Sequence, residues 1–159
     1  MKTLLLIRHA KSDWPENTED FDRPLTELGK INAPKMAKLL LDHQIMVDTL
    51  ISSPAKRAND TCALFAEVFN SDYATEPTLY NPREVHFENI IYALNKEVNT
   101  VAIFSHNNGI SNFANTLTNG IINLPTCGIA VFNVDCDDWS DFEIAKKKLE
   151  YFFTPKKDL

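Results

Sequence analysis

Three segments of the sequence carry side chains that could do chemistry on a phosphoryl group. Arg8-His9 and Ser105-His106 each follow a short apolar run, and Arg57 lies one turn into a predicted helix. Arginine side chains bind phosphate oxygens through paired hydrogen bonds, and a neutral imidazole can attack phosphorus. The residue types and their positions therefore predict a site for a dianionic phosphoryl group.

Each of these residues alone has an ordinary structural explanation. A histidine at the end of a strand is more often a hydrogen-bonded structural residue, and a single arginine is most simply a solvated surface charge. Four cationic or potentially cationic groups close together would repel one another, however, unless an anion lies among them. We therefore expect Arg8, His9, Arg57 and His106 to surround an anionic group.

The elements that must position these residues alternate between strand-like and helix-like segments. The apolar runs 2–7 and 100–104 are typical of strands that are buried on both faces, and 48–51 is a further short strand. In such sheets, ligands bind at the carboxyl ends of the parallel strands, which is where the candidate residues lie. The pattern predicts an α/β protein, a three-layer α/β/α sandwich with a mostly parallel central sheet.

Helices are expected between the strands, and the polar residues 10–24 are expected to form a long loop. Thr26 is a suitable N-cap for the first helix, whose apolar side would consist of Leu28, Ile31, Met36, Leu39 and Leu40. Ser53 is the expected cap of the second helix. The predicted helices cover about 27–41, 54–69, 82–94 and 109–119, and the closing strands cover 128–134 and 142–152.

The composition argues against several classes of partner. The 159 residues carry 16 basic and 22 acidic side chains, so the net charge of −6 argues against nucleic acid. No apolar run approaches the roughly 20 residues that span a bilayer, so no membrane partner is expected. The three cysteines cannot all pair, which is typical of reduced thiols and a cytoplasmic protein. We expect one domain over 1–159, present as a monomer or a weak dimer.

Four motifs, in chain order, resemble those of one enzyme family. Residues 5–10, Leu-Leu-Ile-Arg-His-Ala, resemble the opening Arg-His-Gly motif of the histidine phosphatase superfamily. Ala10 in place of the glycine is similar to the phosphohistidine phosphatase, or SixA-type, branch. Residues 22–29 are similar to the RPL-T-x-x-G element of that branch, and 52–61 to its SP-x-x-RA-x-x-T element. Residues 105–109, Ser-His-Asn-Asn-Gly, are similar to its GH-N-P-G element.

The resemblance implies a phosphoglycerate mutase-like fold, a single histidine phosphatase domain and a covalent mechanism without metal or cofactor. His9 would be the nucleophile and would form a phosphohistidine intermediate that water then hydrolyses. Arg8, Arg57 and His106 would bind the oxygens of the phosphoryl group and stabilise its transfer.

The size of the predicted site favours a protein substrate. Little chain separates the last two motifs, so only residues 10–24 could form a flap over the site. An open site of this kind would accept a phosphorylated side chain, and we expect a histidine-phosphorylated protein as the partner. Lys11, Ser12 and Arg23 are the expected substrate contacts at the rim, with Trp14 as a further candidate.

The sequence offers no strong general acid. Many superfamily members carry a glutamate near the position where this chain has Tyr80 and Asn81. A missing acid fits a leaving group that needs little protonation by the enzyme, such as the imidazole of phosphohistidine. The weak candidates for an acid are Glu84, Glu88, Asp13 and Asp22.

Two alternatives use the same pocket. The protein could be a phosphatase of a small phosphate ester, which faster turnover of such an ester than of a phosphohistidine protein would favour. It could also be a non-catalytic phosphate-binding module, which would bind phosphate or vanadate without turning over any phosphoramidate. Retention of His9 argues against the binding module, because binding alone needs no nucleophile.

Overall fold

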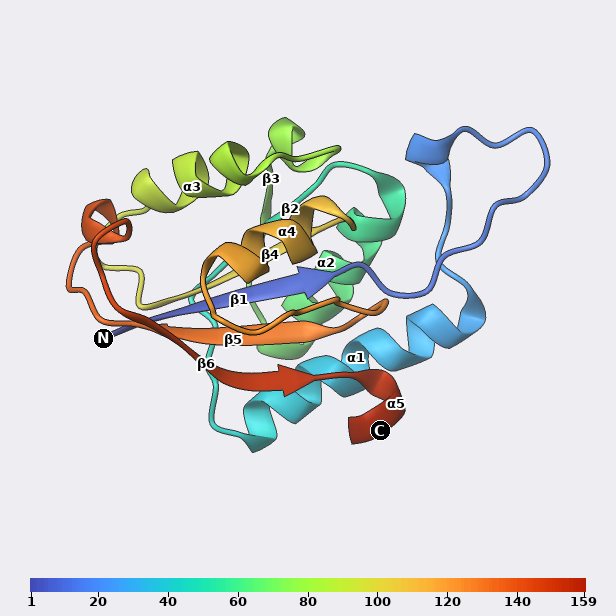
Figure 1. The fold of residues 1–159 in the computed structure, drawn as a ribbon. Helices are drawn as coiled ribbons and strands as arrows, with labels where there is room; N and C mark the ends of the chain where they lie inside the picture. The colour runs from blue at the N-terminus through green and yellow to red at the C-terminus, as the bar shows by residue number, and fades with distance from the viewer.

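The structure, a computed structural model that describes residues 1–159, contains one six-stranded sheet with helices on both faces (Figure 1). The strand order is β3-β2-β4-β1-β5-β6. Five strands run in the same direction, and β5 runs in the opposite direction. The predicted α/β architecture is therefore confirmed. The strands are β1 (Lys2–Arg8), β2 (Thr49–Ser52), β3 (Ala74–Thr75), β4 (Thr100–Ser105), β5 (Ile129–Val134) and β6 (Lys147–Phe153).

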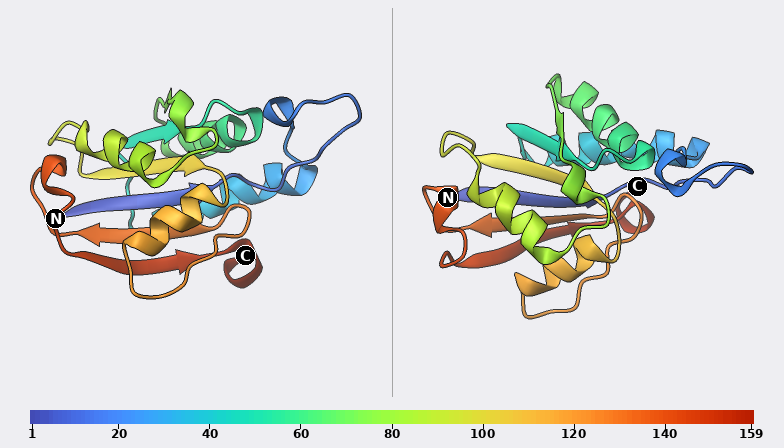
Figure 2. Two further views of the ribbon diagram at one scale, coloured as in Figure 1. Left: turned by 45° about the horizontal axis from the view of Figure 1, so that its top comes forward. Right: turned by 90° about the horizontal axis from the view of Figure 1, so that it is seen from above.

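The helices form two outer layers, with α1 and α2 on one face of the sheet and α3 and α4 on the other (Figure 2). None of them combines the length and the apolar character that crossing a membrane requires. The α-helices are α1 (Glu27–Asp42), α2 (Lys56–Phe69), α3 (Glu84–Tyr92), α4 (Gly109–Thr116) and α5 (Pro155–Asp158), and the 3₁₀ helices are η1 (Asp20–Asp22), η2 (Pro77–Leu79) and η3 (Trp139–Asp141).

Strand β1 is apolar from Leu4 to Ile7 because the sheet has a hydrophobic core on each face. Leu5 and Ile7 pack into the core under α1 and α2, whereas Leu4 and Leu6 pack into the core under α3 and α4. Successive side chains of a strand point to opposite faces, so a strand that is covered on both sides needs apolar residues at every position.

Helix α1 buries only part of the predicted apolar side, because Met36 and Leu40 are buried and Leu39 is half-buried, whereas two predicted residues are exposed. Thr26 is its N-cap, as predicted, and accepts a hydrogen bond from the Gly29 amide at 3.0 Å. Leu28 and Ile31, however, are 50% and 51% exposed. The buried face consists mainly of small residues, which let the helix approach the sheet closely; its members are Gly29, Ala33, Met36, Ala37 and Leu40.

Two further expectations about element ends were wrong. Helix α2 begins at Lys56 with Ala55 as its N-cap, because the Ser53 hydroxyl is engaged earlier, by the Ala55 amide and by His106. Strand β6 begins at Lys147 rather than at 142, since Phe142 follows η3 and is buried in the second core.

The topology brings together the carboxyl ends of the three strands that precede the predicted site residues. Strand β4 lies between β2 and β1, and all three are parallel, so their carboxyl ends meet at one edge. Arg8, the last residue of β1, is paired with Ser105, the last residue of β4. Residues 10–24 leave β1 at this edge and extend beyond it (Figure 1), and they include η1, where only a loop was predicted.

Candidate active site

A cavity of about 570 Å³ opens at this edge, and all seven residues predicted for the site line it. None of the lining side chains is apolar, so the cavity suits a strongly solvated, charged group. Four lining residues were not predicted from the sequence. The lining consists of Arg8, His9, Lys11, Ser12, Arg23, Arg57 and His106, together with the unpredicted Asp20, Asn81, Asn107 and Thr126.

His9 is held in one tautomer by the backbone directly after β1. Its ring Nδ1 lies 2.8 Å from the Ala10 carbonyl oxygen, and a carbonyl can only accept a hydrogen bond. Nδ1 therefore carries the proton, and the lone pair is on Nε2. The Ala10 amide is in turn held by Thr61 Oγ1 at 3.0 Å, which links this turn to α2.

His9 is also kept neutral. Burial, together with the charges of Arg57, Arg8 and Arg23, lowers its pKa to about 4, although the hydrogen bond to Ala10 opposes the shift. The ring is 5% exposed. At neutral pH the imidazole is therefore unprotonated and nucleophilic.

Two arginines, the half-buried Arg8 and the buried Arg57, approach the cavity from different elements. Arg8 ends β1, and its Nη1 donates to the Leu124 carbonyl at 3.1 Å. Arg57 lies in the first turn of α2, is 6% exposed, and donates from both terminal nitrogens to Asp20. Burial and the charge of Arg57 lower the pKa of Arg8. These neighbouring like charges are the electrostatic arrangement that an anion would stabilise.

His106 follows β4 and faces His9, with 5.3 Å between the ring centroids. Its Nε2 lies 2.7 Å from Ser53 Oγ, and its buried Nδ1 has no hydrogen-bond partner. Ser53 Oγ already accepts from the Ala55 amide, so its own proton is available to Nε2. Burial, followed by repulsion from His9 and Arg57, lowers the pKa of His106 to about 3. The ring is neutral, and Nδ1 is its N–H donor.

Asp20, in η1, is the only carboxylate that lines the cavity. Its Oδ2 accepts hydrogen bonds from Tyr80 at 2.6 Å and from Arg57 at 3.1 Å, and its Oδ1 accepts one from Arg23 at 3.3 Å. The Tyr80 hydroxyl is the largest cause that lowers the pKa of Asp20 to about 2, with Arg57 and Arg23 adding to it. Asp20 is therefore ionised at neutral pH.

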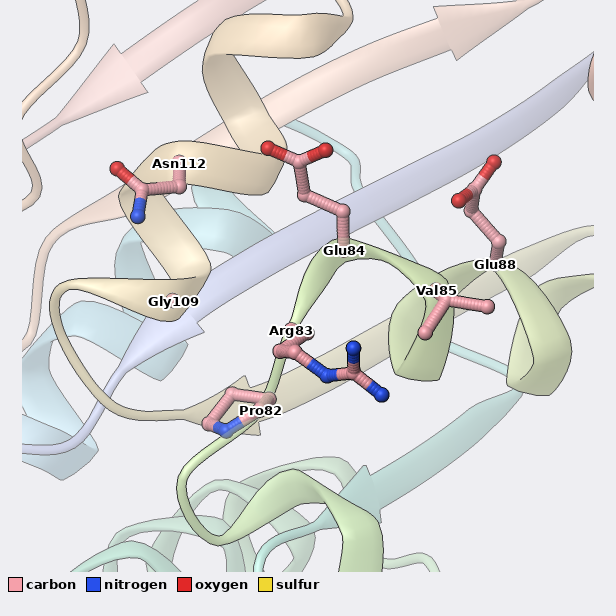
Figure 3. Close-up of a pocket in the computed structure, with 7 residues that line it drawn as sticks. All are labelled: Pro82, Arg83, Glu84, Val85, Glu88, Gly109 and Asn112. Carbon is pink, nitrogen blue, oxygen red and sulfur yellow. The ribbon is translucent and has the colours of Figure 1, made fainter.

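The weak candidates for a general acid all lie outside this cavity. Glu84 and Glu88 line a separate cavity of about 470 Å³ between α3 and α4 (Figure 3), which shares no residue with the first. Asp13 and Asp22 are exposed and line neither cavity. Asn81 does line the first cavity, but its side chain is an amide and not a carboxylic acid, so it cannot serve as the general acid.

Trp14 lies next to the site rather than in it. It is 58% exposed, and the Arg23 guanidinium lies 4.6 Å from the centroid of its ring. Nowhere do three or more His, Cys, Asp or Glu side chains gather so that they could hold a metal ion.

A sequence model of the histidine phosphatase superfamily, branch 1, matches residues 4–97, a segment that includes Arg8, His9 and Arg57. The chain belongs to the histidine phosphatase superfamily. An uncharacterised chloroplastic protein of Arabidopsis thaliana is 28% identical over 152 residues, which are 88% of this chain and 70% of the plant protein.

Solved structures of SixA proteins are similar in fold to this histidine phosphatase. SixA of Agrobacterium tumefaciens is 27% identical and has a TM-score of 0.83, over 97% of this chain and 98% of that one. The protein histidine phosphatase SixA in complex with tungstate has the same TM-score at 22% identity, over 98% of both chains. The predicted superfamily, its SixA-type branch and the phosphoglycerate mutase-like fold are confirmed.

Proposed function

We propose that this phosphatase removes the phosphoryl group of phosphohistidine in a partner protein, with His9 as the nucleophile. The observation that carries the proposal is the hydrogen bond from His9 Nδ1 to the Ala10 carbonyl, which leaves the Nε2 lone pair free at a polar cavity. An unprotonated ring in one fixed tautomer is what attack on phosphorus requires.

The reaction has two steps. His9 Nε2 forms a bond to phosphorus while the bond to the leaving group breaks, and the electron pair of that bond goes to the leaving group. Water then attacks the phosphohistidine on the enzyme, and inorganic phosphate is released. Arg8, Arg57 and the Nδ1–H of His106 bind the phosphoryl oxygens and stabilise the charge that spreads over them during transfer. This scheme uses no metal ion and no cofactor.

Three features support a phosphorylated protein as the substrate. Lys11, Ser12 and Arg23 line the cavity, where they can contact groups next to the phosphoryl group. The exposed ring of Trp14 beside Arg23 offers an aromatic contact of the kind that is enriched in protein interfaces. The SixA structure with tungstate, which has the same fold, is that of a protein histidine phosphatase.

The test compares two substrates. Phosphate release is measured from a histidine-phosphorylated protein and from p-nitrophenyl phosphate, with the wild type and with His9→Asn, in the presence and absence of EDTA. We expect fast loss of the protein phosphate, no effect of EDTA and no activity in the variant. Turnover of the aryl ester alone would assign the site to small esters. Binding of vanadate without turnover of either substrate would leave a phosphate-binding module.

A further inference from the structure

The only acidic side chain at the cavity is Asp20, and it cannot serve as the proton donor that ester hydrolysis usually needs. Its carboxylate is ionised at neutral pH, and the Tyr80 hydroxyl points its proton at this carboxylate rather than at a substrate. No other carboxyl group lines the cavity. No carboxylic acid at the cavity is therefore available to protonate the leaving group.

The position of Asp20 is fixed from three sides. Tyr80 lies directly after η2, Arg57 lies in α2, and Arg23 lies directly after η1, the 3₁₀ helix that contains Asp20. Each donates a hydrogen bond to the Asp20 carboxylate. Phe21 packs edge-to-face on the Tyr80 ring, with 5.2 Å between the centroids, which holds the same turn. A carboxylate with these partners keeps its place when a substrate enters.

Asp20 still has capacity to bind one more donor. A carboxylate offers about four acceptor positions, and side-chain donors occupy three of them. The side chain is 37% exposed, so it faces solvent at the cavity. A cationic N–H group next to the phosphoryl group would find both a free acceptor position and an opposite charge there.

We propose that the Asp20 carboxylate selects the substrate by the charge of its leaving group, favouring a protonated phosphoimidazole ring over a phosphate ester. This inference rests on the proposed function, since it assumes that phosphohistidine enters the site. In that substrate one ring nitrogen carries the phosphoryl group, and the other can carry a proton. The carboxylate accepts a hydrogen bond from this second N–H.

The electron balance of the first step shows why that proton matters. His9 Nε2 bonds to phosphorus, the P–N bond breaks, and its electron pair stays on the departing ring nitrogen. Because the ring is an imidazolium, it leaves as neutral imidazole with its second N–H still in place. An ester with the same enzyme must leave as an oxyanion, whose growing charge Asp20 repels.

The same contact widens the pH range over which the bound substrate ring stays protonated. A carboxylate beside the imidazolium raises the pKa of the bound ring, so the cationic form persists to higher pH. The other charged or titratable groups around Asp20 are Arg57, Arg23, Tyr80 and the neutral His106. The two arginines weaken the attraction but keep their charge throughout the working range, so they do not create a pH dependence of their own.

The experiment measures kcat/KM for phosphoimidazole and for p-nitrophenyl phosphate in Asp20→Asn, a variant of nearly equal shape without the charge. The ratio of the two values is expected to fall by about tenfold, because a charge-assisted contact with only one of the two substrates is lost. With phosphoimidazole, the decline of kcat at high pH is expected to begin at lower pH in the variant than in the wild type, because kcat reports the ionisation of the bound ring.

Two control variants separate charge from anchoring. Asp22→Asn removes an exposed charge two residues away and should leave the ratio unchanged. Tyr80→Phe removes the 2.6 Å hydrogen bond but keeps the carboxylate, so any loss should be equal for both substrates.

Equal loss for both substrates in Asp20→Asn, with an unchanged pH profile, would show that Asp20 only positions Arg57 and would overturn the inference alone. Failure of the wild type to hydrolyse both phosphoimidazole and the histidine-phosphorylated protein would overturn the proposed function as well.

Discussion

The rings of His9 and His106 face each other across the cavity, 5.3 Å apart, and both are neutral in the folded protein. Each ring has one nitrogen engaged by a neighbour, the Ala10 carbonyl for His9 and the Ser53 hydroxyl for His106. Protonation of either ring would add a positive charge beside Arg8 and Arg57. The arrangement therefore suits a nucleophile on one side and a neutral hydrogen-bond donor on the other.

The pH dependence of activity should reflect the low pKa of His9. Only the neutral ring attacks, so activity is lost as the pH falls through the folded-state pKa, which is about 4 rather than the ordinary 6.5. We expect kcat/KM, corrected for the ionisation of the substrate, to stay level from pH 8 to about 5 and to fall below that. A measured decline centred near 6.5 would contradict the assignment.

Replacement of the nucleophile should abolish turnover. In His9→Asn we expect kcat to fall by roughly 10⁴-fold or more, because the other imidazole at the cavity, His106, has its lone-pair nitrogen engaged by the Ser53 hydroxyl. The acid-labile phosphoenzyme that forms on rapid quenching of the wild type should be absent. The matched control is His43→Asn, which alters an exposed histidine whose Nδ1 also lies near a carbonyl, that of Leu39. A phosphoenzyme in His9→Asn would move the nucleophile elsewhere.

Arg57 should be sensitive even to a change that keeps its charge. Arg57→Lys cannot reproduce the paired bonds to Asp20 or a fork to phosphate oxygens, so we expect kcat/KM to fall by about 100-fold. Lys56→Ala, at the neighbouring exposed position, breaks only a surface ion pair with Asp60 and should leave kcat/KM unchanged. Steady-state kinetics of both variants test this. Equal, small effects would exclude Arg57 from phosphoryl binding.

The sequence predicts the residues at the strand ends because their signal is local. A charged or imidazole side chain directly after an apolar run, as at Arg8-His9 and Ser105-His106, is visible without any tertiary information. The parallel arrangement of the strands then brings such residues to one edge. Three of the four cavity residues at the centre of the proposed mechanism, Arg8, His9 and His106, were found in this way. Arg57 was predicted from its position one turn into the helix that follows a strand.

Asp20 was missed because its signal is not local. It lies among several acidic residues of a polar segment, and its partners Arg57 and Tyr80 are 37 and 60 residues away in the sequence. Only the folded chain distinguishes it from Asp22, which stays exposed. The same limit explains Glu84 and Glu88, which are close in sequence to Asn81 at the site but line the separate cavity between α3 and α4 (Figure 3).

The face of α1 shows a different limit. Leu28 and Ile31 are larger and more apolar than Gly29 and Ala33, so hydrophobicity alone selects them as the buried face. The helix instead buries the small residues Gly29, Ala33 and Ala37, together with Met36 and Leu40. At Gly29, the adjacent backbone of Lys11 leaves no room for a side chain. A repeat of small residues at positions 29, 33 and 37 was the available signal.

Gly29 provides the last prediction, which links this close approach to the active site. A Cβ added at Gly29 would overlap with the carbonyl oxygen of Lys11, which also accepts hydrogen bonds from the amide and hydroxyl of Thr26. Alanine in place of glycine ordinarily stabilises a helix by about 0.5–1 kcal/mol, but overpacking costs about 1–3 kcal/mol. We therefore expect Gly29→Ala to lower the free energy of unfolding, measured in urea.

The overlap should also affect substrate binding. Lys11 and the following Ser12 line the cavity, so displacing the Lys11 carbonyl should raise KM for a histidine-phosphorylated protein while His9 keeps its place on Ala10. Gly120→Ala is the matched control, because a Cβ there would meet no atom within 4 Å. Gly120→Ala should leave both stability and KM unchanged. A Gly29→Ala protein as stable as the wild type would show that the segment after His9 yields freely, and that its contact with α1 does not position the rim.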